Sequence, residues 1–295
     1  MSFLEQIIER AKSNIKTIVL PESTDLRVIK AASMIVKKGI AKVVLIGNEN
    51  EIKNLAGDID LQGVIIEDSY NSEKLEDYAN TLYELRKSKG MTIEAAREAI
   101  KDPLYYGVMM VKKGEADGMV AGAVNSTANT LRPALQILKT APGTKLVSSF
   151  FVMVVPDCEY GHNGTFVYSD CGLVENPNAE ELSEIAISAS KSFEILVGAE
   201  PQVAMLSYSS YGSAKSELTE KVIKATQLAK EKAPQLAIDG ELQVDAAIVP
   251  EVQSLKRKEA MWQVRLMFSF SRILIRAILH TSLHRDWQRL KHTDR

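Results

Sequence analysis

Short apolar runs alternate with longer segments whose apolar residues recur at helical spacing along most of the chain. The short runs predict strands, and the longer segments predict helices. Strands are expected at residues 17–20, 43–46, 64–66, 119–121, 146–155, 165–168, 203–207 and 236–238. Helices are expected at residues 24–38, 72–89, 92–112, 179–196 and 213–232. Regular alternation of strands and helices predicts an α/β fold with mostly parallel sheets.

The turn signal Thr140-Ala-Pro-Gly143 divides this alternation into two cycles. We therefore expect a first α/β domain at residues 1–143 and a second at residues 144–257. The length of 295 residues is sufficient for two domains. Residues 258–295 differ in composition and are treated separately below.

Composition excludes several classes of protein. The chain has 45% hydrophobic and 25% charged residues, which is typical of a globular protein. It contains no apolar run long enough to span a membrane and no apolar signal segment at its start, so we expect a cytoplasmic protein without membrane or nucleic-acid partners. Two cysteines, Cys158 and Cys171, are too few for a disulfide framework. Common glycine-rich nucleotide motifs and hydrolase motifs are absent.

The strongest candidate site follows the strand predicted at residues 119–121. Small residues at 122–125 lead to Ser126, Thr127 and Thr130, and then to Arg132, where we expect a helix to begin. Small residues let a ligand approach the backbone, and helix N-termini favour anions. Arg132 adds a guanidinium group that matches phosphate oxygens. Helix capping explains the hydroxyl residues equally well, so spacing alone leaves both interpretations open.

Three further segments carry weaker signals of the same kind. Arg27 follows the first strand, Arg86 lies in a cationic helix end, and residues 207–215 join a strand to a helix through several serines. Capping and solvated charges at a helix end are the commoner explanations. Asp157, Asp170 and Asp239 lie near predicted strand ends, where turn and capping roles are also commoner than ligand binding.

Long segments of the chain resemble phosphate acetyltransferases. The similarity runs almost continuously from residue 1 to about residue 255 and is most specific in four strings. These are TLRPALQILKTAPG from Thr130, SSFFVMVVPDCEYG from Ser148, VAMLSYS from Val203 and AIDGELQVDAAIVP from Ala237.

This resemblance implies a fold, a reaction and a set of substrate-binding residues. It implies two isocitrate-dehydrogenase-like domains with the active site in the cleft between them, and a homodimer. The reaction would move acetyl between coenzyme A and phosphate by direct thiolate attack on acetyl phosphate. Coenzyme A is then a substrate, with no permanently bound cofactor or metal. By resemblance Arg27, Arg86 and Arg132 contact substrate phosphate groups, and Ser126, Thr127 and Thr130 belong to the same binding segment.

Some positions depart from the family pattern. The family usually has His at the position of Asn125, Asp at that of Asn129, and Thr-Lys at that of Ser210-Tyr211. The first two departures each remove a titratable group. They put in doubt any proton transfer or hydrogen-bond orientation at those two positions.

The resemblance ends near Arg257. From there to Arg295 the chain carries seven arginines, two lysines and both tryptophans against three acidic residues. The family's catalytic Ser-Arg pair and its catalytic Asp have no counterpart, so the catalytic residues of this chain are unknown. A shifted reading frame at 258–295 explains the composition, because codons for residues 261–292 read two bases later can encode a family-like segment. In that case the first domain lacks the C-terminal segment that normally completes it, neighbouring strands have unpaired edges, and transferase activity is low or absent. The alternative is a basic amphipathic helix at 262–292 that binds a membrane surface or a partner.

Other functions remain open at this point. A phosphate butyryltransferase would use the same chemistry with a larger acyl pocket. A non-catalytic module would bind coenzyme A or acyl phosphate without turnover. A dehydrogenase can share the fold, and the missing glycine fingerprint argues only weakly against it.

Overall fold

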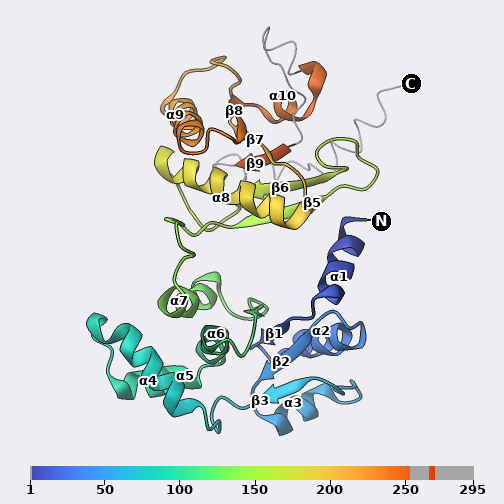
Figure 1. Ribbon diagram of the computed structural model, residues 1–295, viewed down its shortest axis with the longest axis vertical. Coiled ribbons are helices and arrows are strands. Elements are labelled where there is room, and N and C mark those ends of the chain that lie inside the picture. Colours follow the sequence, from blue (N-terminus) through green and yellow to red (C-terminus); the bar gives the residue numbers. More distant parts are fainter. Residues whose placement is uncertain (1, 253–265, 270–295) are drawn as a thin grey trace. The chain divides into compact units, whose positions relative to one another are not determined.

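The structure is a computed structural model that describes residues 2–252 and 266–269. The chain forms two compact units, Met1–Thr140 and Ala141–Arg295 (Figure 1). We call them the first and the second unit and describe each by itself.

A four-stranded parallel sheet forms the centre of the first unit. Its strand order is β3-β2-β1-β4, and β1 pairs with both β2 and β4. The strands are β1 (Thr17–Leu20), β2 (Lys42–Ile46), β3 (Ile65–Glu67) and β4 (Gly118–Met119).

Helices cover both faces of this sheet. Val43 and Leu45 of β2 are buried in one cluster with residues of α2 and α3, whereas Val44 and Ile46 are buried in a second cluster with residues of α4, α5 and α6. Burial on both faces explains why β2 is a continuous apolar run rather than an alternating one. The helices are α1 (Phe3–Ser13), α2 (Leu26–Lys37), α3 (Glu49–Ala56), α4 (Leu75–Arg86), α5 (Ile93–Lys101), α6 (Pro103–Lys113) and α7 (Thr127–Ile137), with a 3₁₀ turn at Lys87–Lys89.

The second unit contains a five-stranded sheet in the order β5-β6-β9-β7-β8. The edge strand β5 is antiparallel to β6, and the other neighbouring strands are parallel. The strands are β5 (Phe150–Val154), β6 (Thr165–Ser169), β7 (Gln202–Leu206), β8 (Ala237–Leu242) and β9 (Leu266–Ser269).

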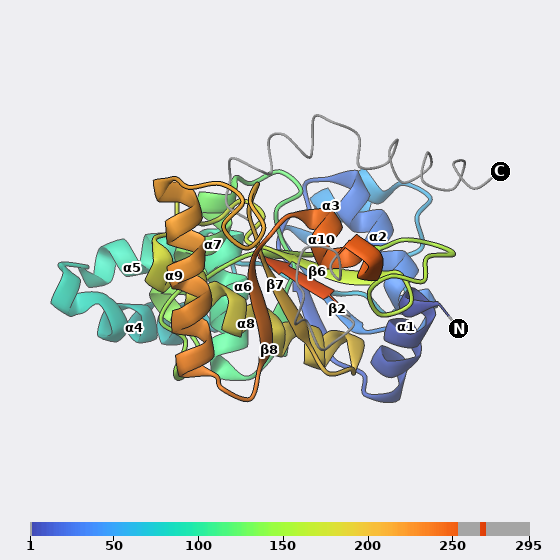
Figure 2. The same ribbon diagram turned by 90° about the horizontal axis from the view of Figure 1, so that it is seen from above.

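Two helices cover one face of this sheet and a short helix covers the other. The helices α8 (Ala179–Val197) and α9 (Glu217–Lys232) bury Phe193 and Val222 against Val203 of β7. The helix α10 (Val244–Ile248) packs against Ala204 and Leu206 on the opposite face (Figure 2). No helix within the described ranges is long and apolar enough to cross a membrane.

The predicted α/β class with mostly parallel sheets is confirmed. The single helix predicted at 92–112 is wrong. It is divided between α5 and α6 at Asp102-Pro103, because Pro103 has no N–H group to continue α5 and Asp102 caps α6. The helix expected to begin at Arg132 begins at Thr127 instead, because Ser126 is its N-cap. The helices α1 and α3 were not predicted.

Most of the segment interpreted as an out-of-frame tail, residues 258–265 and 270–295, lies outside the described residues. Leu266–Ser269 are described and form β9, which pairs with β6 and β7. These three strands belong to the second unit, so the expectation of unpaired edges in the first domain stays a prediction. The alternative of a helix over 262–292 is wrong at these four residues.

Candidate functional site

The loops after β1 and β4 meet at one edge of the first sheet. The chain proceeds from β1 through β2 to β3 on one side, whereas β4 lies on the other side of β1. In open parallel sheets, ligands bind in the crevice at such a change of direction, outside the carboxyl ends of the strands. The candidate residues after both strands therefore belong to one place in the fold.

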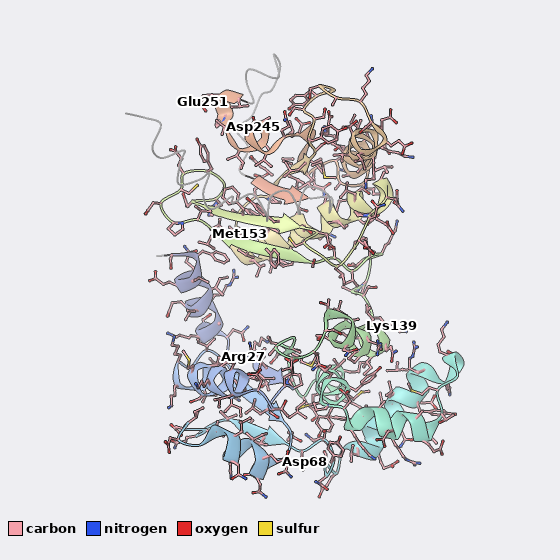
Figure 3. The ribbon with its side chains drawn as sticks, turned by 180° about the vertical axis from the view of Figure 1, so that it is seen from behind. Arg27, Asp68, Lys139, Met153, Asp245 and Glu251 are labelled. Atoms are coloured by element: carbon pink, nitrogen blue, oxygen red, sulfur yellow. The ribbon has the colours of Figure 1, made fainter. Side chains whose placement is uncertain are left out.

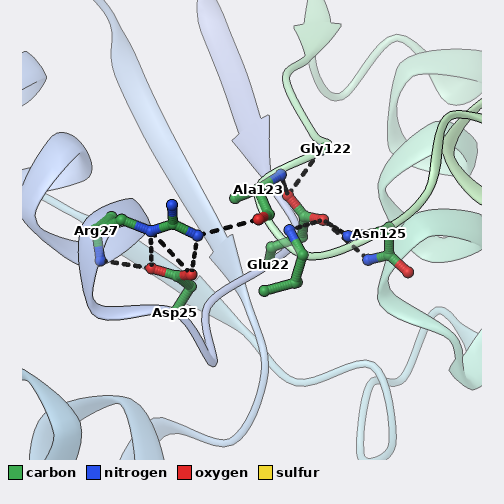
Figure 4. Close-up of polar contacts among 7 residues, drawn as sticks. Glu22, Asp25, Arg27, Gly122, Ala123 and Asn125 are labelled. Carbon is green, nitrogen blue, oxygen red and sulfur yellow. Dashed lines mark hydrogen bonds and ion pairs between the residues drawn. The ribbon is translucent and has the colours of Figure 1, made fainter.

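Glu22 joins these two loops. One of its carboxylate oxygens, Oε2, accepts hydrogen bonds from the backbone N–H groups of Gly122 (2.8 Å) and Ala123 (2.6 Å). The other, Oε1, accepts from the backbone N–H groups of Val124 (3.1 Å) and Asn125 (2.8 Å) and from Nδ2 of Asn125 (2.9 Å), as Figure 4 shows. The backbone of residues 122–125, which we expected a ligand to approach, therefore already holds a carboxylate of the chain.

Glu22 is only 4% exposed. Burial by itself raises the pKa of its carboxyl group, but the hydrogen bonds from Asn125, Ala123 and Val124 outweigh burial and lower the pKa to about 2. The side chain is therefore a carboxylate at neutral pH, and its negative charge is permanent under those conditions.

Arg27 makes a second connection between the loops. It lies in the first turn of α2 (Figure 3), and its guanidinium group contacts the carboxylate of Asp25 with Nη2 2.6 Å from Oδ2. Nη2 also donates to the backbone oxygen of Ala123 at 3.0 Å. Asp25 caps α2 by accepting from the N–H of Arg27 at 2.7 Å, so capping, the commoner explanation for this segment, applies here. The Arg27 side chain is 74% exposed and can reach solutes.

The hydroxyl residues of the second loop have different environments. Ser126 caps α7, because its Oγ accepts from the N–H of Asn129 at 3.2 Å. Thr127 is the exposed first residue of α7. Thr130 is different, because its Oγ1 is buried and has no hydrogen-bond partner among the described residues.

Arg86 and Arg132 both lie near Tyr105. Burial raises the pKa of the Tyr105 hydroxyl, and the positive charges of Arg132 and Arg86 act in the opposite direction. The Tyr105 hydroxyl donates to Oε1 of Gln136 at 3.0 Å, which ties α6 to α7. The Nε of Arg86 is buried and, within the described part of the chain, has no partner. Two guanidinium groups from different helices, one of which has a buried Nε without a partner among the described residues, form an arrangement that suits an anion.

Two loops of the second unit also hold buried carboxylates. Asp170 follows β6 and accepts from the backbone N–H groups of residues 172–174 and from the hydroxyl of Ser149. Glu241 accepts from the Ser209 hydroxyl and the Gly212 N–H, both at 2.8 Å. The 207–215 loop, a weaker candidate for phosphate binding, is therefore organised around Glu241. Ser213 does not cap α9, which begins after Ser216.

The role of Glu22 was not predicted. Arg27 was the residue of this segment expected to contact an anion, whereas the residue that links the two loops is the acid directly after Pro21. A glutamate just beyond a buried strand was the available signal, but its partners lie 100 to 103 residues away along the chain. Among the described residues no group of three or more His, Cys, Asp or Glu side chains could hold a metal ion.

Comparison with known proteins connects this arrangement to one family. The model of the phosphate acetyl/butaryl transferase family matches residues 2–265. The chain is 92% identical over 258 residues to a phosphate acetyltransferase of Acetivibrio thermocellus, covering 88% of this chain and 78% of the relative. It is 55% identical over 256 residues to a phosphate acetyltransferase of Thermoanaerobacterium thermosaccharolyticum, covering 87% and 78%.

The fold agrees with these sequence matches. A crystal structure of a phosphotransacetylase from Streptococcus pyogenes superposes with a TM-score of 0.82 at 36% identity, covering 90% of this chain and 80% of that one. The family model spans most of the chain, and two relatives are more than half identical to it. The chain therefore belongs to the phosphate acetyl/butaryl transferase family.

Proposed function

We propose that the reaction of this chain is the reversible transfer of acetyl between coenzyme A and inorganic phosphate, with low or absent turnover because residues 258–295 replace the segment that carries the family's catalytic residues. The observations that carry the proposal are the two arginines near Tyr105, Arg86 of α4 and Arg132 of α7, and the buried hydroxyl of Thr130 on α7. The Nε of Arg86 and the Oγ1 of Thr130 are buried polar atoms without partners in the described ranges. Such atoms cost free energy unless a ligand satisfies them, and both substrates of this reaction carry phosphate groups.

The chemistry is an acyl transfer. The thiolate of coenzyme A attacks the carbonyl carbon of acetyl phosphate, a C–S bond forms, the C–O bond to phosphate breaks and phosphate leaves with the electron pair. The proton of the thiol goes to a base. Guanidinium groups of Arg86 and Arg132 would hold phosphate oxygens, which orients the reactants and stabilises negative charge. Arg27 would add a third cation by turning from Asp25 toward a substrate phosphate.

The family's catalytic Ser-Arg pair and its catalytic Asp have no counterpart in the sequence, which is the reason for expecting little turnover. The butyryl alternative is not favoured, since the relatives at 92% and 55% identity are both phosphate acetyltransferases. A module that binds coenzyme A without turnover would still need the arginine group, so binding and turnover are tested separately.

Calorimetric titration with coenzyme A tests the binding site. Arg86→Ala and Arg132→Ala should each weaken binding by about tenfold or more, the usual loss for a hydrogen bond to a charged group. The matched control is Arg97→Ala, because Arg97 is an exposed arginine of the same unit paired with Glu76. Wild-type affinity in both test variants would refute the site. Acetyl-CoA formation from acetyl phosphate then distinguishes an enzyme from a binding module.

The proposal includes a homodimer. Its support is β5, an edge strand with exposed Phe150, Phe151, Met153 and Val154. An exposed apolar edge strand is a surface that favours association with another chain. Light scattering should give a dimer for the wild type and a monomer for Phe151→Lys, and a monomeric wild type would refute this part.

We draw two more inferences about this protein, one on its cellular location and one on residues 258–295. We infer a cytoplasmic enzyme, which agrees with Cys158 and Cys171 both being free thiols. We also infer that residues 258–295 are translated out of frame, because their composition differs sharply from that of the body. The nucleotide sequence across codons 250–295 tests this: a reading frame that no single-base change returns to the family sequence would refute it.

A further inference from the structure

At the change of direction between β1 and β4, a carboxylate of the chain itself occupies the backbone donors of the second loop. Four consecutive backbone N–H groups, from Gly122 to Asn125, converge on the Glu22 carboxylate together with Nδ2 of Asn125. Consecutive N–H groups of this kind form a concave anion site. Gly122 has a φ of +112°, which favours glycine, so the loop conformation that gathers these donors depends on this residue.

The loop is held through its carbonyl side as well. Arg27 donates to the Ala123 oxygen at 3.0 Å while it is paired with Asp25. Asp25 is the main reason that the pKa of Arg27 is raised, and the Glu22 charge contributes in the same direction. Glu22, Asp25 and Arg27 therefore form one charged network that fixes residues 122–125 (Figure 4).

We propose that Glu22 is a positioning residue for substrate binding: it fixes the 122–125 loop ahead of α7 and excludes substrate phosphate from that loop. A buried carboxylate occupies both the donors and the space, and its charge repels a second anion. Substrate phosphate is thereby directed to the arginines of α4 and α7. Ser126 caps α7 directly after the loop. The loop therefore also fixes where α7 begins, and with it the positions of Thr130 and Arg132.

The claim that Glu22 directs substrate rests on the proposed function. The claim that the N–H groups of residues 122–125 form an anion site, here called the anion cradle, does not. The first experiment therefore uses no substrate. Amide hydrogen exchange is measured for residues 120–127 in the wild type and in Glu22→Ala, without and with added acetate ion. Exchange should be about tenfold or more faster in the variant, because the charged acceptor of these N–H groups is lost. Acetate should restore protection in Glu22→Ala and change nothing in the wild type.

The second experiment measures affinity for coenzyme A by calorimetry in Glu22→Gln. The matched control is Val43→Ala, a fully buried residue of β2 in the same unit that lies outside the two loops. Glu22→Gln should weaken binding about tenfold or more. Val43→Ala should bind coenzyme A as tightly as the wild type does, even where its melting temperature falls as much as that of Glu22→Gln. Equal losses in both variants would mean a general stability effect and overturn the positioning role.

The outcomes separate the two claims. Unchanged exchange in Glu22→Ala, or exchange that acetate does not slow, overturns the anion cradle. Faster exchange with unchanged affinity in Glu22→Gln overturns the substrate part. A wild-type chain that does not bind coenzyme A at all refutes the proposed function and the substrate part with it, while the exchange experiment still decides the cradle.

Discussion

Removing the charge of Glu22 should destabilise the protein strongly at neutral pH and only weakly in acid. The pKa of Glu22 falls from an ordinary 4.5 to about 2 in the folded protein. A difference of this size corresponds to about 3 kcal/mol of folding free energy at pH 7. Because the side chain is only 4% exposed, solvent screening removes little of it.

The pH dependence follows from the lowered pKa. A carboxyl group with a depressed folded pKa contributes fully above its unfolded pKa, and the contribution is lost as the pH falls toward the folded value. The Glu22 contribution should therefore be complete above about pH 5.5, fall to about 1.4 kcal/mol at pH 3 and vanish below about pH 2.

Urea unfolding of the wild type and Glu22→Gln, followed by far-ultraviolet circular dichroism at pH 7, 5 and 3, measures this difference. All other carboxyl groups titrate in both proteins, so the difference between the two isolates Glu22. Glu76→Gln is the control, because Glu76 is an exposed partner of Arg97 and should give little change at any pH. A loss for Glu22→Gln below about 1 kcal/mol at pH 7, or one equal at pH 7 and pH 3, would refute the reasoning.

Three further substitutions test other features. Thr130→Val removes a buried hydroxyl that has no partner among the described residues, so the melting temperature should stay equal or rise while coenzyme A affinity falls; a lower melting temperature would show that the hydroxyl is satisfied in the folded protein. Gly107→Ala would place a Cβ 2.9 Å from Sδ of Met119 and 3.0 Å from Cγ1 of Val19, so urea unfolding should show a loss of about 1–3 kcal/mol, and a neutral result would mean that α6 shifts easily. Phe193→Ala leaves a cavity at a fully buried position of α8 and should cost about 3–5 kcal/mol in the same assay; a loss under about 1 kcal/mol would contradict the packing described.

Central strands such as β2 could be predicted because they are buried on both faces. A run such as Lys42–Ile46 is apolar at four successive positions, and parallel strands covered by helices on both sides require this composition. The helices were harder to bound, because capping decides where they start and stop. Asp102 begins α6, which periodicity alone merged with α5, and Ser126 begins α7, whose start was placed too late. The helix α3 has eight residues, which is too short for a strong periodic signal.

The candidate site was only partly accessible from sequence. The resemblance named Arg27, Arg86 and Arg132, and the polar loop after β4 was recognised as the richest segment. What sequence could not reveal is that this loop already holds an anion. The pairing of Glu22 with Gly122–Asn125 depends on two strands, distant in the chain, being neighbours in the sheet, and no local pattern carries that information.

Among the described strands of the second sheet, the central one, β9, comes last along the chain. While β5 to β8 are already synthesised, the slot between β6 and β7 stays vacant until Leu266–Ser269 arrive. Until then, the second unit can form only two separate partial sheets, one ending at β6 and one at β7. The unpaired edges of these two strands can pair with other strands. A chain that stops before residue 266 would lack the strand that joins β6 to β7, so its second sheet would stay divided.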